Sequence, residues 1–119
     1  MGSIYGQKFD KAVRELRKKV PLPVSAKVKT KKNLMCQETG DALYGQCTAH
    51  VNSRGRIKRF TIEISRDLPL DVAVDTLLHE WAHAVDQMEN GADDEEHPHR
   101  DSWGVAYAKT WRAYMDEDD

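Results

Sequence analysis

The chain has 119 residues, a formal net charge of -2, and 39% hydrophobic and 32% charged residues. This length suits one domain with its own core, and the chain has no run of about 18 apolar residues that would span a membrane. The start lacks the apolar core of a signal peptide, and two cysteines, Cys36 and Cys47, are too few for a disulfide scaffold. We therefore expect one domain over residues 1–119, with a short acidic tail at 116–119, in the reducing cytoplasm and without a membrane partner.

The charges are distributed unevenly along the chain. Residues 1–66 carry 15 lysines and arginines against 5 acids, a formal charge of +10, whereas residues 67–119 carry 3 against 15, a formal charge of -12. A basic segment of this kind favours a polyanion such as DNA as a partner. The other interpretation is that the two halves attract each other within the folded domain.

The first predicted element is an amphipathic helix over about residues 3–19. Apolar side chains recur there at three- and four-residue spacing, while lysines and arginines occupy the other faces. The apolar positions are Phe9, Val13, Leu16 and Val20. Pro21 ends the helix, because a residue before proline is disfavoured in the helical region.

Three strands are predicted next, at about residues 24–29, 43–51 and 57–65. The first alternates apolar and polar residues, so its lysines point to solvent, where they protect a sheet edge or contact a nucleic-acid backbone. These lysines are Lys27, Lys29, Lys31 and Lys32. Residues 33–42 are a predicted loop, and Gly55 supplies the positive φ of a hairpin between the second and third strands.

Two helices complete the predicted chain. The first is capped by Asp71 and runs to Asn90, where Gly91 stops it. An acidic loop over residues 92–98 leads to a final helix that begins at Asp101 or Ser102. One face of that helix carries residues predicted to be core, which are Trp103, Tyr107, Thr110, Trp111 and Tyr114. This order predicts an α+β fold, with a three-stranded antiparallel sheet packed on an N-terminal helix and two C-terminal helices.

The first of those two helices carries the pattern H-E-x-x-H in His79, Glu80 and His83. Residues four apart share a helix face, so the two imidazoles can bind one metal ion. Glu80 lies about 100° around the helix, where its carboxylate reaches a metal-bound water and serves as general base. Nitrogen ligands favour Zn²⁺. The pattern therefore predicts a zinc site.

A catalytic zinc site needs a third protein ligand and one open position. His99, directly before the final helix, is the favoured third ligand. His97 is an alternative, and Asp86 is another because it lies seven residues after His79 on the same face, as a ligand or as a carboxylate that orients an imidazole. His50 lies in a strand, where packing or a hydrogen bond is expected.

Residues 76–84, with the sequence TLLHEWAHA, and residues 97–104, with the sequence HPHRDSWG, resemble the SprT-like zinc metallopeptidase domain of Spartan-type DNA–protein crosslink proteases. The resemblance covers most of the chain and implies a zincin-like core with His79, His83 and His99 as zinc ligands and Glu80 as catalytic base. The chain is similar to compact phage-encoded members and lacks the C-terminal cysteine-rich zinc ribbon. It departs from the family at residues 100–102, where Arg-Asp-Ser replaces Gly-Pro-Glu.

The expected function is that of a zinc-dependent metalloendopeptidase that cleaves proteins or peptides, including DNA-associated proteins, in the host cytoplasm if the chain is phage-encoded. Tyr107, Tyr44 and His97 are candidates for a second electrophile beside the metal. Two other interpretations remain. One is a zinc-stabilised binding protein directed at a host factor, and the other is a nucleic-acid-associated module that uses the basic segment.

Overall fold

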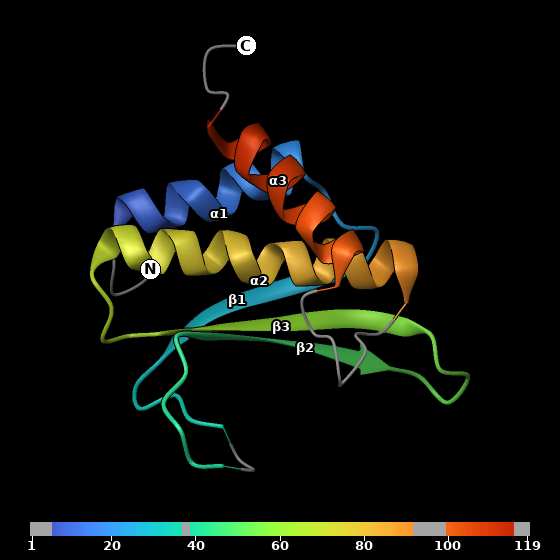
Figure 1. Cartoon of the computed structure of the whole chain (residues 1–119), viewed down its shortest axis with the longest axis horizontal. Helices are drawn as coiled ribbons and strands as arrows, with labels where there is room; N and C mark the ends of the chain where they lie inside the picture. Colours follow the sequence, from blue (N-terminus) through green and yellow to red (C-terminus); the bar gives the residue numbers. More distant parts are fainter. Residues whose placement is uncertain (1–5, 37–38, 92–99, 116–119) are drawn as a thin grey trace.

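The structure, a computed structural model, describes residues 6–36, 39–91 and 100–115, and contains three helices and three strands (Figure 1). In chain order these elements are α1 (Gln7–Lys19), β1 (Ser25–Lys31), β2 (Gly45–Val51), β3 (Ile57–Ser65), α2 (Leu70–Asn90) and α3 (Asp101–Met115). The α+β class and the order of elements are confirmed.

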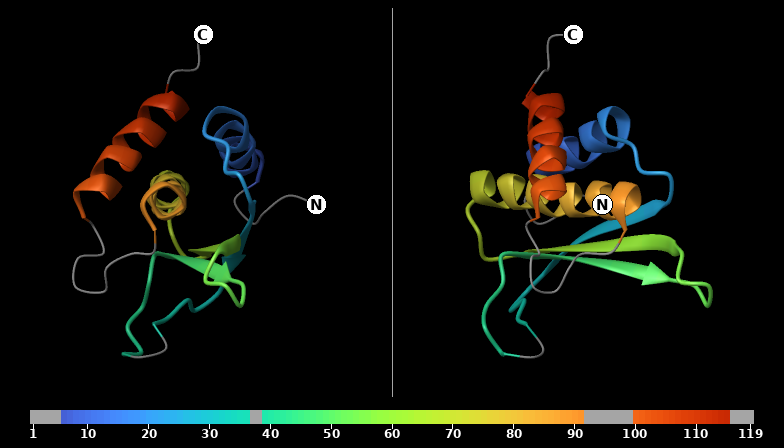
Figure 2. Two further views of the ribbon diagram at one scale, coloured as in Figure 1. Left: turned by 90° about the vertical axis from the view of Figure 1, so that its right-hand side faces the viewer. Right: turned by 45° about the vertical axis from the view of Figure 1, so that its right-hand side comes forward.

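The helices all lie on one face of the sheet. Viewed along α2, this helix lies directly on the sheet, with α1 and α3 above it on either side (Figure 2). Below the sheet Figure 1 shows the described part of the connection between β1 and β2. A two-layer arrangement of this kind leaves one sheet face for the core and the other for solvent.

The sheet is mixed, so the prediction of an antiparallel sheet is wrong for one strand. The strand order is β1-β3-β2, with β1 parallel and β2 antiparallel to β3. The parallel pair joins β1 to β3, which are not successive strands, whereas the prediction was based on connections between successive strands alone. The long connection after β1 leads to β2, and β3 then returns between them through the hairpin at residues 52–56, where Gly55 has a φ of +78°.

The composition of β3 explains its central position. Phe60, Ile62 and Ile64 have no exposed surface and all point toward the helices, as predicted. The two outer strands bury less of their surface, and in β1 the polar and partly buried residues alternate as predicted. The strand with the most apolar surface to bury therefore lies where both of its edges are paired.

Two helix starts differ from the predictions. Helix α1 begins at Gln7, because Gly6 has a φ of +78° and a non-helical ψ. Helix α2 begins at Leu70 with Pro69 before it, and Asp71 lies in the first turn instead of capping it. The backbone N–H of Ala73 donates to the carbonyl of Pro69 at 2.8 Å, so the first turn closes two residues earlier than predicted. In the first turn the negative charge of Asp71 still stabilises the helix, because it lies near the positive end of the helix dipole.

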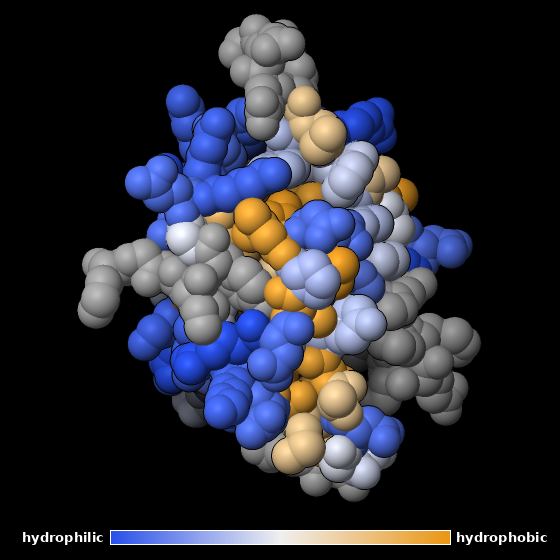
Figure 3. Space-filling view, turned by 90° about the vertical axis from the view of Figure 1, so that its left-hand side faces the viewer, coloured by the Kyte–Doolittle hydropathy of each residue, from blue (hydrophilic) through white to orange (hydrophobic). Residues whose placement is uncertain are grey.

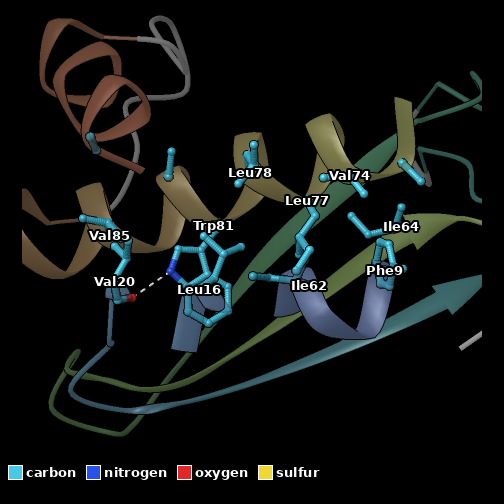
Figure 4. Close-up of a cluster of buried hydrophobic side chains, with 14 residues drawn as sticks. Phe9, Leu16, Val20, Ile62, Ile64, Val74, Leu77, Leu78, Trp81 and Val85 are labelled. Atoms are coloured by element: carbon cyan, nitrogen blue, oxygen red, sulfur yellow. Dashed lines mark hydrogen bonds between the residues drawn. The ribbon is translucent and has the colours of Figure 1, made fainter. Parts of the chain in front are cut away.

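The core lies between α1, α2 and β3 (Figure 4). Trp81 of α2 is 1% exposed, and its indole Nε1 donates a hydrogen bond to the carbonyl of Val20 at 2.9 Å. That bond satisfies the one polar atom of a large buried side chain and holds the end of α1 against α2. Helix α2 is buried on most sides, as its apolar sequence predicts.

Helix α3 packs on α2 through a narrower face than predicted. Ala106 and Thr110 are buried, and Trp103, Tyr107 and Tyr114 are partly buried against the core. Trp111 is 41% exposed, which corrects its assignment to the core. Trp111 lies one position beyond Thr110, so it falls at the edge of the face defined by residues 103, 106, 107 and 110.

Cys36 and Cys47 are both partly buried and are not joined by a disulfide. None of the described helices is both long enough and apolar enough to cross a membrane.

Candidate metal and substrate site

The H-E-x-x-H residues lie in the middle of α2. The ring centroids of His79 and His83 are 5.0 Å apart in an edge-on arrangement, which confirms that the two imidazoles share one helix face. His83 and Glu80 are each 7% exposed, and the Nδ1 atom of His83 is buried. The two imidazoles and the carboxylate are therefore adjacent and shielded, which is the arrangement the motif predicts.

Glu80 lies where α2 closely approaches the start of β2. A Cβ atom built on Gly45, the first residue of β2, would lie 2.6 Å from Cγ2 of Thr76 and 3.1 Å from Cγ of Glu80. Only glycine leaves room for this approach, because real Cβ atoms essentially never come within 3.0 Å of another heavy atom. Gly45 thus lets the edge strand lie directly beside the candidate catalytic carboxylate.

A cleft of about 280 Å³ opens at this contact. Its lining comes from α2 and from the start of β2 and consists of Tyr44, Gly45, Asp75, Thr76, His79 and Glu80. Figure 3 shows the side of the molecule with the first turns of α2, where an interrupted band of apolar side chains runs between hydrophilic ones. The cleft therefore joins two functional side chains to the end of an edge strand.

Helix α3 places two aromatic rings over the histidines. The Trp103 ring centroid is 4.8 Å from that of His79 and 5.3 Å from that of His83, and its Nε1 donates to the backbone carbonyl of His79 at 3.5 Å. Tyr107 stacks on Trp103 at 5.1 Å, with an interplanar angle of 9°. These rings limit the movement of both imidazoles and shield them from water on the α3 side.

Tyr107 is tied to the first half of α2. Its hydroxyl donates to Oδ1 of Asp75 at 2.8 Å. Burial, together with this hydrogen bond and the charge of Asp75, raises the pKa of Tyr107 to about 12. The phenol therefore remains a hydrogen-bond donor over the whole physiological pH range.

Asp86 serves a different purpose from either of its predicted roles. It is fully buried and accepts hydrogen bonds from Arg100 Nε at 2.9 Å and from Asn90 Nδ2 at 3.0 Å. Burial by itself raises the pKa of Asp86, but the hydrogen bonds from Ser102, Arg100 and Asn90 and the charge of Arg100 outweigh it and lower the pKa. The carboxylate is thus directed to the start of α3 instead of to an imidazole.

Arg100 completes this connection between the helices. Its Nη2 donates to the carbonyl of Gly91 at 2.6 Å, while its Nε binds Asp86. The residue that directly precedes α3 is therefore fixed to the last turn of α2, one turn after His83.

Of the other predicted site residues, one lines the cleft, and the rest lie apart from the site or outside the described residues. His50 hydrogen-bonds to Oγ1 of Thr61 at 2.8 Å on the solvent face of the sheet, as predicted for a strand histidine. Tyr44 lines the cleft. His97 and His99 lie outside the described residues. Among residues 6–36, 39–91 and 100–115, no three metal-ligating side chains meet at one point.

The donors that are described fit zinc. Two imidazoles on successive turns supply two of the three nitrogen ligands of an H-E-x-x-H site, and a buried glutamate lies next to them. No third ligand for such a site is found among the described residues.

Three residues around this site were not predicted from the sequence, which are Asp75, Gly45 and Arg100. Asp75 was detectable, because it lies four residues before His79 on the same helix face. Gly45 gave no signal, because a glycine at the start of a strand is common for several reasons. The Asp86–Arg100 pair required knowledge of how α3 crosses α2.

Comparison of the chain with models of protein families, with curated proteins and with solved structures gives no match in any of the three.

Proposed function

We propose that the chain is a zinc-dependent metalloendopeptidase of the SprT-like kind, with His79, His83 and His99 as zinc ligands and Glu80 as general base. The observation that carries the proposal is the 5.0 Å pairing of the two imidazoles beside the buried Glu80 at a cleft. The resemblance of residues 97–104 to the SprT-like domain supports His99 as the third ligand.

The residues of the site have separate roles in the proposed peptide hydrolysis. A zinc ion held by His79, His83 and His99 would supply Lewis-acid chemistry at this site. Glu80 accepts the proton of the attacking water and then donates it to the departing amine. Trp103 keeps the imidazole of His79 in place and shields it from water. Low exposure around Glu80 and His83 strengthens these electrostatic interactions.

We propose that an extended substrate lies along strand β2. Strand β2 is an edge strand, and it starts at Gly45 beside the cleft. An extended peptide that pairs with β2 gains main-chain hydrogen bonds and runs past Glu80. The other edge, β1, pairs with β3 on the far side of the sheet from β2, so β2 is the edge that serves the cleft.

The test combines zinc content with cleavage of a denatured protein. We expect wild type to hold about one zinc per chain, the number of metal ions in a single H-E-x-x-H site. His99→Ala should lose the zinc, because two imidazoles alone bind it weakly. Glu80→Gln should keep the zinc but lose cleavage, because the amide is not a base. Cleavage by Glu80→Gln at the wild-type rate would refute the role of Glu80.

The same experiment separates the peptidase from a zinc-stabilised binding protein. A binding protein retains zinc through His79, His83 and His99, cleaves nothing under any condition, and keeps its biological activity in the Glu80→Gln variant. Adding single-stranded DNA to parallel reactions shows whether DNA activates cleavage, as the Spartan-type resemblance implies.

A second candidate function is binding to the nucleic-acid backbone through the solvent face of the sheet. Lys27, Lys29 and Lys31 alternate along β1 and are exposed. The register places Arg59 and Glu63 of β3 on the same face. The carboxylate of Glu63 lies 3.9 Å from Nζ of Lys29. Residues two apart on a strand lie about 6.6 Å from each other, so these lysines form a regular cationic row.

This candidate predicts salt-sensitive affinity for DNA. Neutralising three to four phosphates gives a slope of log affinity against log salt of about -2 to -3 for a single strand. Replacing Lys27, Lys29, Lys31 and Lys32 with glutamate should abolish the binding, as measured by fluorescence anisotropy. If the charge-reversed protein binds as tightly as wild type, the sheet face is not the site.

A further inference from the structure

The ionisable lining of the cleft is mostly acidic. Besides His79, its titratable groups are the carboxylates of Asp75 and Glu80 and the phenol of Tyr44, and no lysine or arginine of the described residues lines it. With the charge of Glu80 offset by the proposed Zn²⁺, the carboxylate of Asp75 remains as a local negative charge that attracts a cation. The lining therefore gives the cleft a preference by charge that the zinc motif alone does not imply.

Asp75 is placed to act on a substrate. It lies four residues before His79, so its side chain projects from the same face of α2. It is exposed, and the Tyr107 hydroxyl holds its Oδ1 at 2.8 Å. Within the described residues no lysine or arginine forms a salt bridge with it. The carboxylate is thus fixed in position while its charge is not neutralised by a neighbouring cation.

Tyr44 adds an aromatic surface to the same cleft. It lies directly before Gly45, is 65% exposed, and is far more accessible than an aromatic side chain that serves the core. A flat π face next to a carboxylate is the combination that binds guanidinium and ammonium groups, because the cation gains from both.

We propose that the cleft selects substrates by a lysine or arginine side chain, which pairs with Asp75 and stacks on Tyr44. The inference rests on the proposed peptidase function, because it identifies the cleft as the place where substrate binds. It names basic, extended protein segments as the substrate class. Asp75 is then the specificity-determining residue, and Tyr107 is the positioning residue that holds it.

The binding test uses two fluorescein-labelled unstructured peptides that differ only in a central arginine or citrulline. Citrulline keeps the shape of arginine but carries no charge. In the Glu80→Gln background, where cleavage is absent, we expect the arginine peptide to bind about two- to fivefold more tightly by anisotropy, the range measured for partly exposed ion pairs.

Matched variants identify the residue responsible. Adding Asp75→Asn should remove the preference, because asparagine keeps the acceptor for Tyr107 but not the charge. Asp71→Asn is the control, because Asp71 is an exposed acid one turn earlier on α2 that does not line the cleft. Asp75→Lys should reverse the preference toward a peptide with a central glutamate. Equal affinity for both peptides, or no measurable binding of either, overturns the inference.

A cleavage assay on wild type separates this inference from the proposed function. If the protein cuts both peptides with equal kcat/KM, the peptidase proposal stands and the charge selection is refuted. If it cuts neither but binds the arginine peptide in an Asp75-dependent way, the selection stands and the peptidase proposal fails. Thermal unfolding of every variant within a few degrees of wild type excludes misfolding as the cause.

Discussion

The contact between α2 and the start of β2 depends on Gly45, which has no side chain. At Gly45 the backbone of β2 lies against Thr76 and Glu80, and the carbonyl of Glu63 is 3.3 Å from the position of an added Cβ. A methyl group at this position has a neighbour on each side. The geometry of the candidate base is therefore set from the sheet as well as from its own helix.

We predict that Gly45→Ala destabilises the fold by about 1–3 kcal/mol, the usual cost of an overpacked contact. Cleavage should fall further than stability, because Thr76 and Glu80 have to shift. Urea unfolding and peptidase assays measure the two effects. Gly104→Ala is the control: nothing lies within 4 Å of an added Cβ there, so alanine in α3 should stabilise the fold by about 0.5–1 kcal/mol. Equal effects at both positions would contradict the packing argument.

The phenol of Tyr107 should titrate apart from the other tyrosines. Its pKa in the folded state is about 12, above the ordinary value of about 10. The associated stability is therefore complete below pH 10 and is lost as the pH rises toward 12. The difference in ultraviolet absorbance between wild type and Tyr107→Phe should show a transition near pH 12.

The variant Asp75→Asn should lower that transition toward pH 10, because it removes the acceptor charge while burial remains. If Asp75→Asn leaves the transition near pH 12, the hydrogen bond to Asp75 does not persist in solution.

At the scale of elements, the buried Asp86 determines how α3 crosses α2. Its carboxylate binds Arg100 before α3 and Ser102 in the first turn of α3. Trp103, which contacts both histidines, follows directly in the chain. Loss of this anchor should loosen the aromatic cover of the metal motif before it unfolds the domain, because the core between α1, α2 and β3 does not depend on it.

We predict that Asp86→Asn lowers the free energy of unfolding by about 1–3 kcal/mol at neutral pH, in line with hydrogen bonds to charged groups. The folded pKa of Asp86 lies below its unfolded value of about 3.9, so this stability is present above that pH and is lost as the pH falls below it. The difference between wild type and variant should be constant above about pH 5 and shrink below about pH 4.

Urea unfolding of metal-free protein over a pH series measures this difference. Asp67→Asn, at an exposed residue in the turn before α2, should show no comparable trend. A difference between wild type and Asp86→Asn that does not depend on pH would show that the carboxylate is not ionised in the fold.

The sequence predicted the elements better than their arrangement. Strand β3 was predicted with correct bounds because apolar and polar residues alternate strongly along it, and its own side chains on one face are all large and apolar. The parallel pairing of β1 was missed, because pairing partners depend on which strand needs both edges covered. The metal-motif helix was predicted from local spacing, whereas the contribution of α3 to the site required contacts between residues 14 or more apart.

At the scale of the whole molecule, zinc should contribute to stability as a ligand of the folded state alone. Free zinc at about a thousand times its Kd stabilises by about 4 kcal/mol. We predict that a chelator lowers the Tm of wild type by several degrees and leaves the Tm of His79→Ala unchanged, as measured by circular dichroism. An equal effect on both proteins would show that the metal does not bind through α2.

The strand order has a consequence for synthesis on the ribosome. Strand β1 emerges early, but its pairing partner β3 follows 34 residues later, as the pair Ser25 and Arg59 shows. Until then β1 has no sheet to join, and its partly apolar face remains open to other nascent chains. The lysines on its other face repel such partners, so during translation they keep the strand soluble before any function of the finished protein begins.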